Sequence, residues 1–163
     1  MIDALPPEPY TTICNNCVYI TNSRELNSQN NIIYNVDVII NHEVYNFKSL
    51  SGRSWTQSLD RNIADQGAPS PNGRYTIGSL TDGLHPETGG VFLPYEPTFD
   101  TERSFLGFHI DPSWGLNNEE DGTVGCHAFK TKEDFYQFLT LIEDNNIREL
   151  IINDEKPKRY ISR

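Results

Sequence analysis

A histidine and a cysteine on either side of a polar loop are the residues of this sequence that could form a catalytic pair. His109 closes the apolar run 105–108, which predicts a buried strand that ends near the histidine. Cys126 follows Gly125 where the polar loop 112–122 ends and a second short apolar run begins. A cysteine on a glycine-flanked turn has room for a substrate carbonyl, and a histidine on a neighbouring strand can remove the thiol proton. The pattern predicts acyl transfer by a thiol, a base and backbone N–H donors for the oxyanion.

The other histidines have simpler interpretations. His127 would point to the opposite face from Cys126 if this segment is a strand, so a structural role is expected for it. His42 lies in a predicted turn, and His85 lies in a loop before a proline. We therefore expect His109 to be the base.

Length and charge narrow the class of protein. With 163 residues the chain is long enough for one domain with a real core. The formal net charge of −10 argues against a nucleic-acid or anionic-membrane partner, because phosphate binding requires clustered Lys and Arg. No apolar run approaches transmembrane length, so no membrane insertion is expected.

Residues 1–7 have neither a basic region nor an apolar region, which argues against a Sec signal in this sequence. We expect a protein that is made in the cytoplasm and is exported by a non-Sec route or acts in the periplasm or cell wall. The alternatives are that it stays in the cytoplasm or that a leader precedes this sequence.

The sequence contains three cysteines, and an odd number favours free thiols over a disulfide framework. Cys14 and Cys17 have the spacing of a metal knuckle, but no second pair completes four ligands. Reduced side chains are the favoured interpretation for both, with a reversible local disulfide or a zinc site as alternatives. No metal or organic cofactor is predicted.

Alternating and β-branched segments predict a mainly β protein with one amphipathic helix near the C-terminus. Thr131 and Asp134 form a capping box at the start of this helix, and Asn145 can end it in the left-handed region. Its apolar face, which would cover the sheet, consists of Phe135, Phe138, Leu139 and Ile142. The predicted strands are 17–21, 32–40, 43–50, 74–77, 91–95, 104–110 and 148–152.

The domain organisation predicted from these elements is a single domain. Residues 1–31 form an N-terminal extension with the first strand, and 23–31 within them are a polar loop. Residues 32–152 form the catalytic part, in which 55–66 are irregular or briefly helical, and 153–163 are a C-terminal tail.

Three motifs in a fixed order resemble the L,D-transpeptidase catalytic domain, also called the YkuD-like domain. The motifs are Pro71-Asn72-Gly73-Arg74-Tyr75-Thr76-Ile77, then His109, then Thr123-Val124-Gly125-Cys126. The family has a similar strand entry, a downstream histidine and a (Ser/Thr)-His-Gly-Cys block. The resemblance covers roughly residues 32–152 and implies the β-sandwich or barrel of that family.

This resemblance implies peptidoglycan chemistry. Cys126 would attack the carbonyl between the third, diamino-acid residue of a stem peptide and the terminal D-alanine, and His109 would transfer the proton. A carbonyl just after the histidine, from Ile110 or Asp111, would orient the imidazole. The N–H groups of Gly125 and Cys126 would hold the oxyanion. The acyl-enzyme would pass to an amine in transpeptidation or to water in carboxypeptidation.

Two positions depart from the family pattern. The histidine before Gly-Cys is Val124 here, after Thr123, and the Arg or Asn that follows the cysteine by two is Ala128. A partner for the substrate carboxylate must therefore come from elsewhere, and Arg103 is the candidate. The altered block resembles a divergent branch that includes interbacterial toxin effectors, which implies secretion machinery and an immunity protein as further partners.

Two other functions use the same residues. An NlpC/P60-like peptidoglycan amidase has its cysteine first, at a helix N-terminus, and Cys14 or Cys17 followed by His109 has that order, although no helix is predicted after either cysteine. A non-catalytic wall-peptide-binding module is the second alternative. Activation of Cys126 predicts reaction with iodoacetamide well below the pH at which a free thiol reacts.

Overall fold

The computed structural model describes residues 14–82, 90–111, 123 and 125–153 of the chain. His85 and Val124 lie outside these residues. The strands and the helix, in chain order, are β1 (Cys17–Leu26), β2 (Ile32–Ile40), β3 (Glu43–Ser51), β4 (Gly73–Ile77), β5 (Thr81–Asp82), β6 (Val91–Pro97), β7 (Leu106–Ile110), β8 (His127–Phe129), α2 (Lys132–Asp144) and β9 (Glu149–Ile152).

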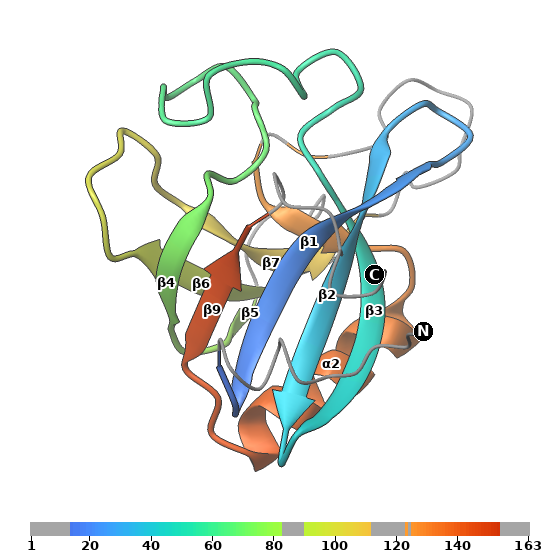
Figure 1. Cartoon of the computed structure of the whole chain (residues 1–163), viewed down its shortest axis with the longest axis vertical. Coiled ribbons are helices and arrows are strands. Elements are labelled where there is room, and N and C mark those ends of the chain that lie inside the picture. Colours follow the sequence, from blue (N-terminus) through green and yellow to red (C-terminus); the bar gives the residue numbers. More distant parts are fainter. Residues whose placement is uncertain (1–13, 83–89, 112–122, 124, 154–163) are drawn as a thin grey trace, which may run out of the picture.

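The described strands form a closed β-barrel with the helix at one end (Figure 1). The strand order is β4-β9-β1-β2-β3-β8-β7-β6, and pairing of β6 with β4 closes the barrel. The short β5 pairs with the start of β6. Closure leaves few unpaired strand edges among these residues. The prediction of a mainly β protein with one helix near the C-terminus is confirmed.

The barrel interior is filled by alternate residues of its strands. On β7, Leu106, Phe108 and Ile110 all belong to the main core cluster. Gly107 and His109 fall between them in the sequence, so they face the other side of the sheet. This alternation fixes which side of the sheet each candidate site residue occupies.

Helix α2 forms as its sequence predicts. The Thr131 hydroxyl accepts a hydrogen bond from the Asp134 N–H at 3.1 Å, which caps the first turn. The four predicted apolar residues are buried and join the barrel core, where α2 contacts β2, β7 and β8. The helix lies near the end of the barrel at which β2 turns into β3 (Figure 1). In the described part of the chain, no helix has the length and apolar character that crossing a membrane requires.

Several strand boundaries differ from the prediction, and the backbone explains two of the differences. β1 continues to Leu26 instead of ending at residue 21, because Glu25 and Leu26 pair with the start of β2 beyond a bulge at Arg24, where φ is +70°. β7 begins at Leu106 instead of residue 104, because Phe105 has a φ of +55°, which no extended strand accommodates. The extension of β1 was not predicted because its residues are mostly polar. β7 is shorter than predicted because Phe105 has a backbone conformation that is rare for phenylalanine.

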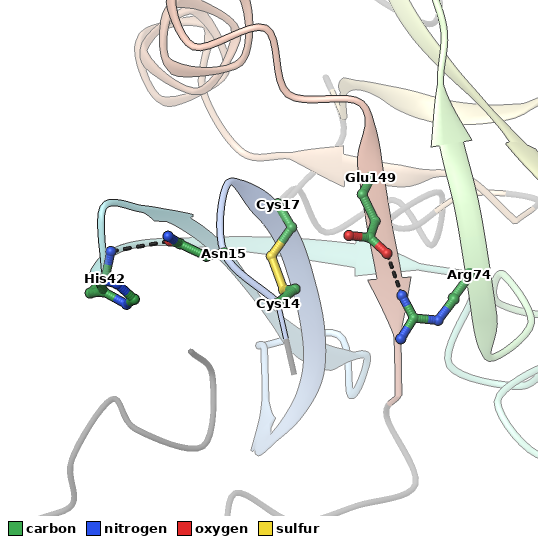
Figure 2. The surroundings of a disulfide bond; sticks show 6 residues. All are labelled: Cys14, Asn15, Cys17, His42, Arg74 and Glu149. Carbon is green, nitrogen blue, oxygen red and sulfur yellow. Dashed lines mark hydrogen bonds and ion pairs between the residues drawn. A yellow bond between two sulfur atoms is a disulfide. The ribbon is translucent and has the colours of Figure 1, made fainter. Parts of the chain in front are cut away.

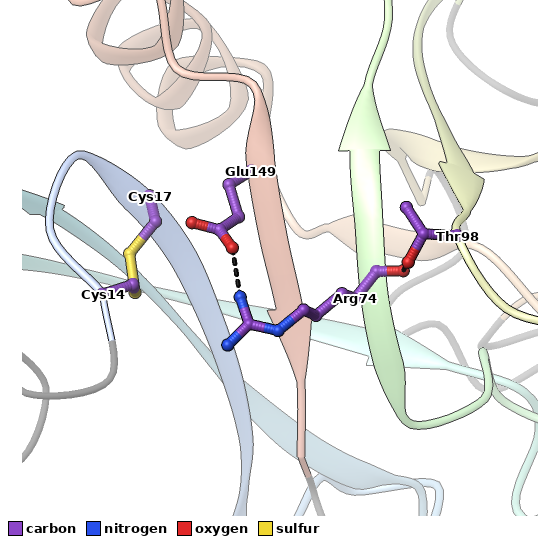
Figure 3. Close-up of polar contacts among 5 residues, drawn as sticks. All are labelled: Cys14, Cys17, Arg74, Thr98 and Glu149. Atoms are coloured by element: carbon purple, nitrogen blue, oxygen red, sulfur yellow. Dashed lines mark hydrogen bonds and ion pairs between the residues drawn. A yellow bond between two sulfur atoms is a disulfide. The ribbon is translucent and has the colours of Figure 1, made fainter.

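The seam that closes the barrel lies between β4, β9 and β6. The Arg74 guanidinium forms an ion pair with Glu149 of β9 (Figure 3). The Arg74 carbonyl accepts hydrogen bonds from the N–H and the hydroxyl of Thr98, just after β6. Arg74 therefore joins strands that come from distant parts of the sequence.

Cys14 and Cys17 form a disulfide, with their Cα atoms 6.1 Å apart (Figure 2). The expectation of two reduced side chains was wrong, and a zinc site on the same sulfur atoms is excluded by this bond. Both cysteines pack with Tyr19, Ile39 and Ile151 in a second apolar cluster. The number of cysteines did not reveal this disulfide, because two cysteines three positions apart can be either reduced or bonded to each other.

The hairpin between β2 and β3 turns at His42, as expected. Asn41 and His42 both have positive φ values, of +51° and +68°, and the His42 N–H donates to the Asn15 side-chain oxygen at 3.1 Å (Figure 2). Nothing in this contact brings His42 near Cys126 or His109.

Candidate active site

His109 and Cys126 come from paired strands. β7 and β8 are parallel, with His109 opposite Ala128 and Phe108 opposite His127. Cys126 immediately precedes β8 and shares a face with Ala128, two residues later. The Cys126 thiol and the His109 imidazole therefore lie on the same side of the sheet, on neighbouring strands.

The contacts of His109 fix its tautomer. Its Nδ1 lies 2.8 Å from the Ile110 carbonyl oxygen, and a carbonyl can only accept a hydrogen bond. Nδ1 therefore carries the proton, and Nε2 of the neutral ring has the free lone pair that a base needs. The ring stacks on Phe92 at a centroid distance of 6.4 Å. The carbonyl of Ile110, one of the two that the resemblance implied, is the one that lies at Nδ1.

Burial keeps His109 neutral. The residue is 8% exposed, and burial lowers its pKa below the usual histidine value. The hydrogen bond to Ile110 and the negative charge of Asp111 oppose this shift without cancelling it. Asp111 is itself buried, and its backbone N–H donates to the Phe129 carbonyl at 2.7 Å. At neutral pH the imidazole can therefore accept a proton.

Cys126 is the free cysteine of the described chain and is 9% exposed. Burial raises the pKa of its thiol to about 11. A backbone hydrogen bond from Gly107 and the positive charge of Arg103 lower the pKa, but burial outweighs both. The thiol is 3.6 Å from the Phe105 carbonyl, which it can donate to. The resting site thus holds a neutral thiol and a neutral imidazole on the same side of the sheet.

The Thr123 hydroxyl fixes the loop that carries the cysteine. Its oxygen accepts hydrogen bonds from the Gly52 N–H at 3.0 Å and the Gly125 N–H at 2.9 Å, and it donates to the Cys126 carbonyl at 2.7 Å. The Gly125 N–H, expected to bind the oxyanion, instead donates to this hydroxyl. Thr123 is therefore an orienting residue within the chain.

The Gly125 carbonyl is held by two buried serines. It accepts hydrogen bonds from the Ser51 hydroxyl at 3.0 Å and the Ser70 hydroxyl at 2.5 Å. The Ser70 hydroxyl also lies 2.7 Å from the Tyr95 hydroxyl, within the core. In a trans peptide the C=O and the next N–H point in opposite directions, so the Cys126 N–H is directed away from these serines. That N–H is therefore the candidate backbone donor for an oxyanion.

Arg103 is engaged by the protein backbone. The residue is 7% exposed, and its guanidinium donates to the carbonyls of Arg61 at 2.8 Å, Pro69 at 3.1 Å and Ala68 at 2.8 Å. These bonds tie the loop 61–69 to the segment before β7. These three bonds use three of the five N–H donors of the guanidinium. The role expected for Arg103, binding a substrate carboxylate, stays a prediction.

His127 lies on the opposite side of the sheet from Cys126. Its Nδ1 is 2.8 Å from the Ser49 hydroxyl, and its ring packs edge-on against Tyr34 at 5.2 Å. Complete burial lowers its pKa to about 3, with smaller contributions from Arg61 and His109. These contacts are those of a structural core histidine.

Sequence reasoning placed Ser51 in a structural turn that borders the site and treated Phe92 as a core aromatic, and it gave Ser70 no role. Ser51 lies at a break in the strand pattern before Gly52, and Ser70 lies between two prolines. Serines in such places are expected in turns. Their roles depend on a pairing of distant segments, which local sequence does not encode.

Comparisons with known proteins give a fold-level likeness. No family model matches the chain, and no match was found among curated proteins. The chain is similar in structure to the helical cell shape determining protein Pgp2 from Campylobacter jejuni, with a TM-score of 0.57 and 15% sequence identity. The likeness covers 90% of this chain and 50% of the Pgp2 chain, so this chain spans about half of that structure. Such identity shows a shared fold alone.

Proposed function

We propose that this protein is a cysteine acyltransferase or peptidase of the L,D-transpeptidase type that acts on peptidoglycan stem peptides. The observation that carries the proposal is the position of Cys126 and His109 on the same side of two paired strands. The Ile110 carbonyl, 2.8 Å from His109 Nδ1, supports the base role because it leaves Nε2 unprotonated.

In the proposed reaction the thiol is deprotonated during attack. His109 Nε2 takes the Cys126 proton while sulfur bonds to the carbonyl carbon that precedes the terminal D-alanine. The Cys126 N–H stabilises the resulting oxyanion. Collapse of this intermediate breaks the C–N bond, and His109 returns the proton to the leaving D-alanine amine. Water or another amine then attacks the thioester, which gives carboxypeptidation or transpeptidation.

Two further observations support a role at the cell wall. The structural neighbour Pgp2 determines helical cell shape, and bacterial shape is maintained by the peptidoglycan wall. The Cys14–Cys17 disulfide supports action in an oxidising compartment such as the periplasm. The effector role, with its secretion machinery and immunity protein, remains a prediction from sequence resemblance.

The disulfide weighs against the amidase alternative. An NlpC/P60-like mechanism would need Cys14 or Cys17 as a free nucleophile, whereas both sulfur atoms are bonded to each other and β1 follows them in place of a helix. The remaining alternative is a wall-peptide-binding module. The neutral, largely buried thiol of Cys126 favours this binding module over an enzyme whose thiol is already ionised before substrate binds.

Mass spectrometry of purified disaccharide-tetrapeptide tests the proposal. The wild-type protein should release the terminal D-alanine or exchange it for another D-amino acid, and Cys126→Ala should do neither. The double variant Cys14→Ser/Cys17→Ser is the matched control and should retain the reaction. Cleavage that survives in Cys126→Ala would refute the role of this thiol, and binding without turnover by the wild type would favour the binding module.

A further inference from the structure

A cavity of about 430 Å³ has Cys126 among its lining residues. Its walls come from the loop around Ala64, Asp65 and Gly67 and from the segment just before β7. Cys126 is nine-tenths buried and contributes to the lining. A ligand in this cavity would therefore meet the nucleophile of the proposed reaction.

The cavity and His109 approach Cys126 from different directions. Phe105 and Leu106, which line the cavity, lie at the start of β7, and His109 lies near its end. Gly107, between them, hydrogen-bonds through its backbone to the Cys126 thiol. A ligand can therefore reach the thiol from the start of β7 while the imidazole stays at the other side.

The wall of the cavity bears two exposed carboxylates, those of Asp65 and Glu102. One Glu102 oxygen accepts a hydrogen bond from the Ala64 N–H at 3.0 Å, which holds the side chain beside the loop. Arg103 is also part of the lining, and its guanidinium is bound to three backbone carbonyls. The charge is thus positive in the buried lining and negative where the cavity meets solvent.

Phe105 adds an aromatic surface to the same opening. It is 90% exposed, more than any other large apolar side chain of the described residues, and it has a φ of +55°. Its carbonyl lies 3.6 Å from the Cys126 thiol, and the residue belongs to the lining of the cavity. An aromatic face beside carboxylates is the combination that binds an ammonium group, by cation–π attraction and charged hydrogen bonds.

We propose that this cavity is a subsite for an ammonium group of a peptide substrate, with Asp65, Glu102 and Phe105 as the residues that select it. The proposal rests on the proposed function, because it assigns the amine to the substrate whose carbonyl Cys126 attacks. The amine belongs either to the side chain of the acyl donor or to the acceptor that resolves the thioester.

Charged thiol reagents test the subsite without requiring enzymatic turnover. The probes are two methanethiosulfonates of permanent charge, the trimethylammonioethyl cation and the sulfonatoethyl anion, and mass spectrometry measures their rates of addition to Cys126. The test variant is Asp65→Asn/Glu102→Gln. Gln keeps the acceptor for the Ala64 N–H, and Asn is well suited to the φ of +66° at position 65.

The ratio of cation rate to anion rate should fall about tenfold in this variant at low ionic strength. Glu143→Gln/Asp144→Asn at the end of α2 is the control with the same change in net charge and should keep the wild-type ratio. Phe105→Leu should slow the cation about threefold and leave the anion unchanged. An unchanged ratio in Asp65→Asn/Glu102→Gln, or an equal fall in the control, would overturn the proposal.

Peptide substrates then identify which amine occupies the subsite. Acetylation of the donor side-chain amine should raise KM for D-alanine release in the wild type but not in Asp65→Asn/Glu102→Gln, if the donor is bound there. If the acceptor is bound there, the variant should instead need a higher amine concentration for transfer. If wild type and variant use free and acetylated peptides equally well and use all acceptors equally well, both the donor amine and the acceptor amine are refuted as occupants of the subsite. Failure of all turnover would count against the proposed function, while the reagent ratio would still test the subsite.

Discussion

The guanidinium of Arg103 lies against Gly125, so closely that a Cβ on this glycine would be 2.0 Å from Arg103 Nη2. Gly125 also has a φ of +139°, which residues with a side chain rarely adopt. Since Arg103 binds the loop 61–69, this contact packs the cysteine loop onto that loop. The glycine before the cysteine is thus required by backbone geometry and by the arginine beneath it.

Gly125→Ala should destabilise the protein and displace Cys126. We expect a loss of roughly 2–4 kcal/mol in the free energy of unfolding, from backbone strain and the clash with Arg103 together. Gly90→Ala is the matched control, because Gly90 has a φ of +81° but nothing within 4 Å of the added Cβ. It should cost only about 1 kcal/mol. Equal losses in urea denaturation of the two variants would show that the Arg103 contact is unimportant.

The serines that hold the Gly125 carbonyl should affect catalysis more than their distance from the thiol suggests. In Ser51→Ala/Ser70→Ala the peptide before Cys126 can rotate, and its N–H can leave the position that we propose for the oxyanion. We expect kcat to fall about tenfold or more, since loss of one oxyanion donor has effects of 10²–10³. Ser23→Ala is the control, because its hydroxyl also donates to a backbone carbonyl, that of Ile33, on a remote part of β1. A KM change without a kcat change would contradict this role.

The sequence predicted the fold class because alternation and capping are local signals. The period-two pattern in 32–40 and the capping box at Thr131 each depend on neighbouring residues, and both elements formed. The candidate pair was proposed on similar grounds, from an apolar run that ends near His109 and a glycine before Cys126. The register that places the two on one side of the sheet could only be seen in the structure.

Long-range pairing explains what the sequence did not predict. Three N–H donors of Arg103 bind carbonyls that lie 34 to 42 residues earlier in the chain, and Gly125 is held by Ser51 and Ser70. No local pattern reports such contacts. The disulfide and the raised pKa of Cys126 likewise depend on what lies around the sulfur atoms.

Alkylation of Cys126 should require alkaline pH. Burial raises the thiol pKa to about 11, so the thiolate fraction, and with it the iodoacetamide rate, should keep rising between about pH 8 and 11. This replaces the sequence-based expectation of rapid reaction at low pH. Free glutathione measured in parallel corrects for the intrinsic pH dependence of a thiol, and Cys126→Ala should show no alkylation. A rate that levels off below pH 8 would show a pre-formed thiolate and contradict the neutral resting pair.

His127 should make the protein sensitive to acid. Its pKa is about 3 in the folded protein and near 6.5 when unfolded, so the unfolded chain takes up a proton first as the pH falls. The stabilisation from neutral His127 is complete above about pH 6.5 and decreases by up to about 1.4 kcal/mol per pH unit down to about pH 3. His127→Asn keeps an acceptor for the Ser49 hydroxyl but cannot titrate.

The free energy of unfolding of wild type and His127→Asn, measured from pH 7 to pH 4, isolates this effect from the carboxylates that both proteins share. The variant should be less stable at pH 7, because it loses the packing against Tyr34, yet its stability should fall less with acid. Parallel pH profiles for wild type and His127→Asn would mean that His127 is protonated in the folded state, which its complete burial makes unfavourable.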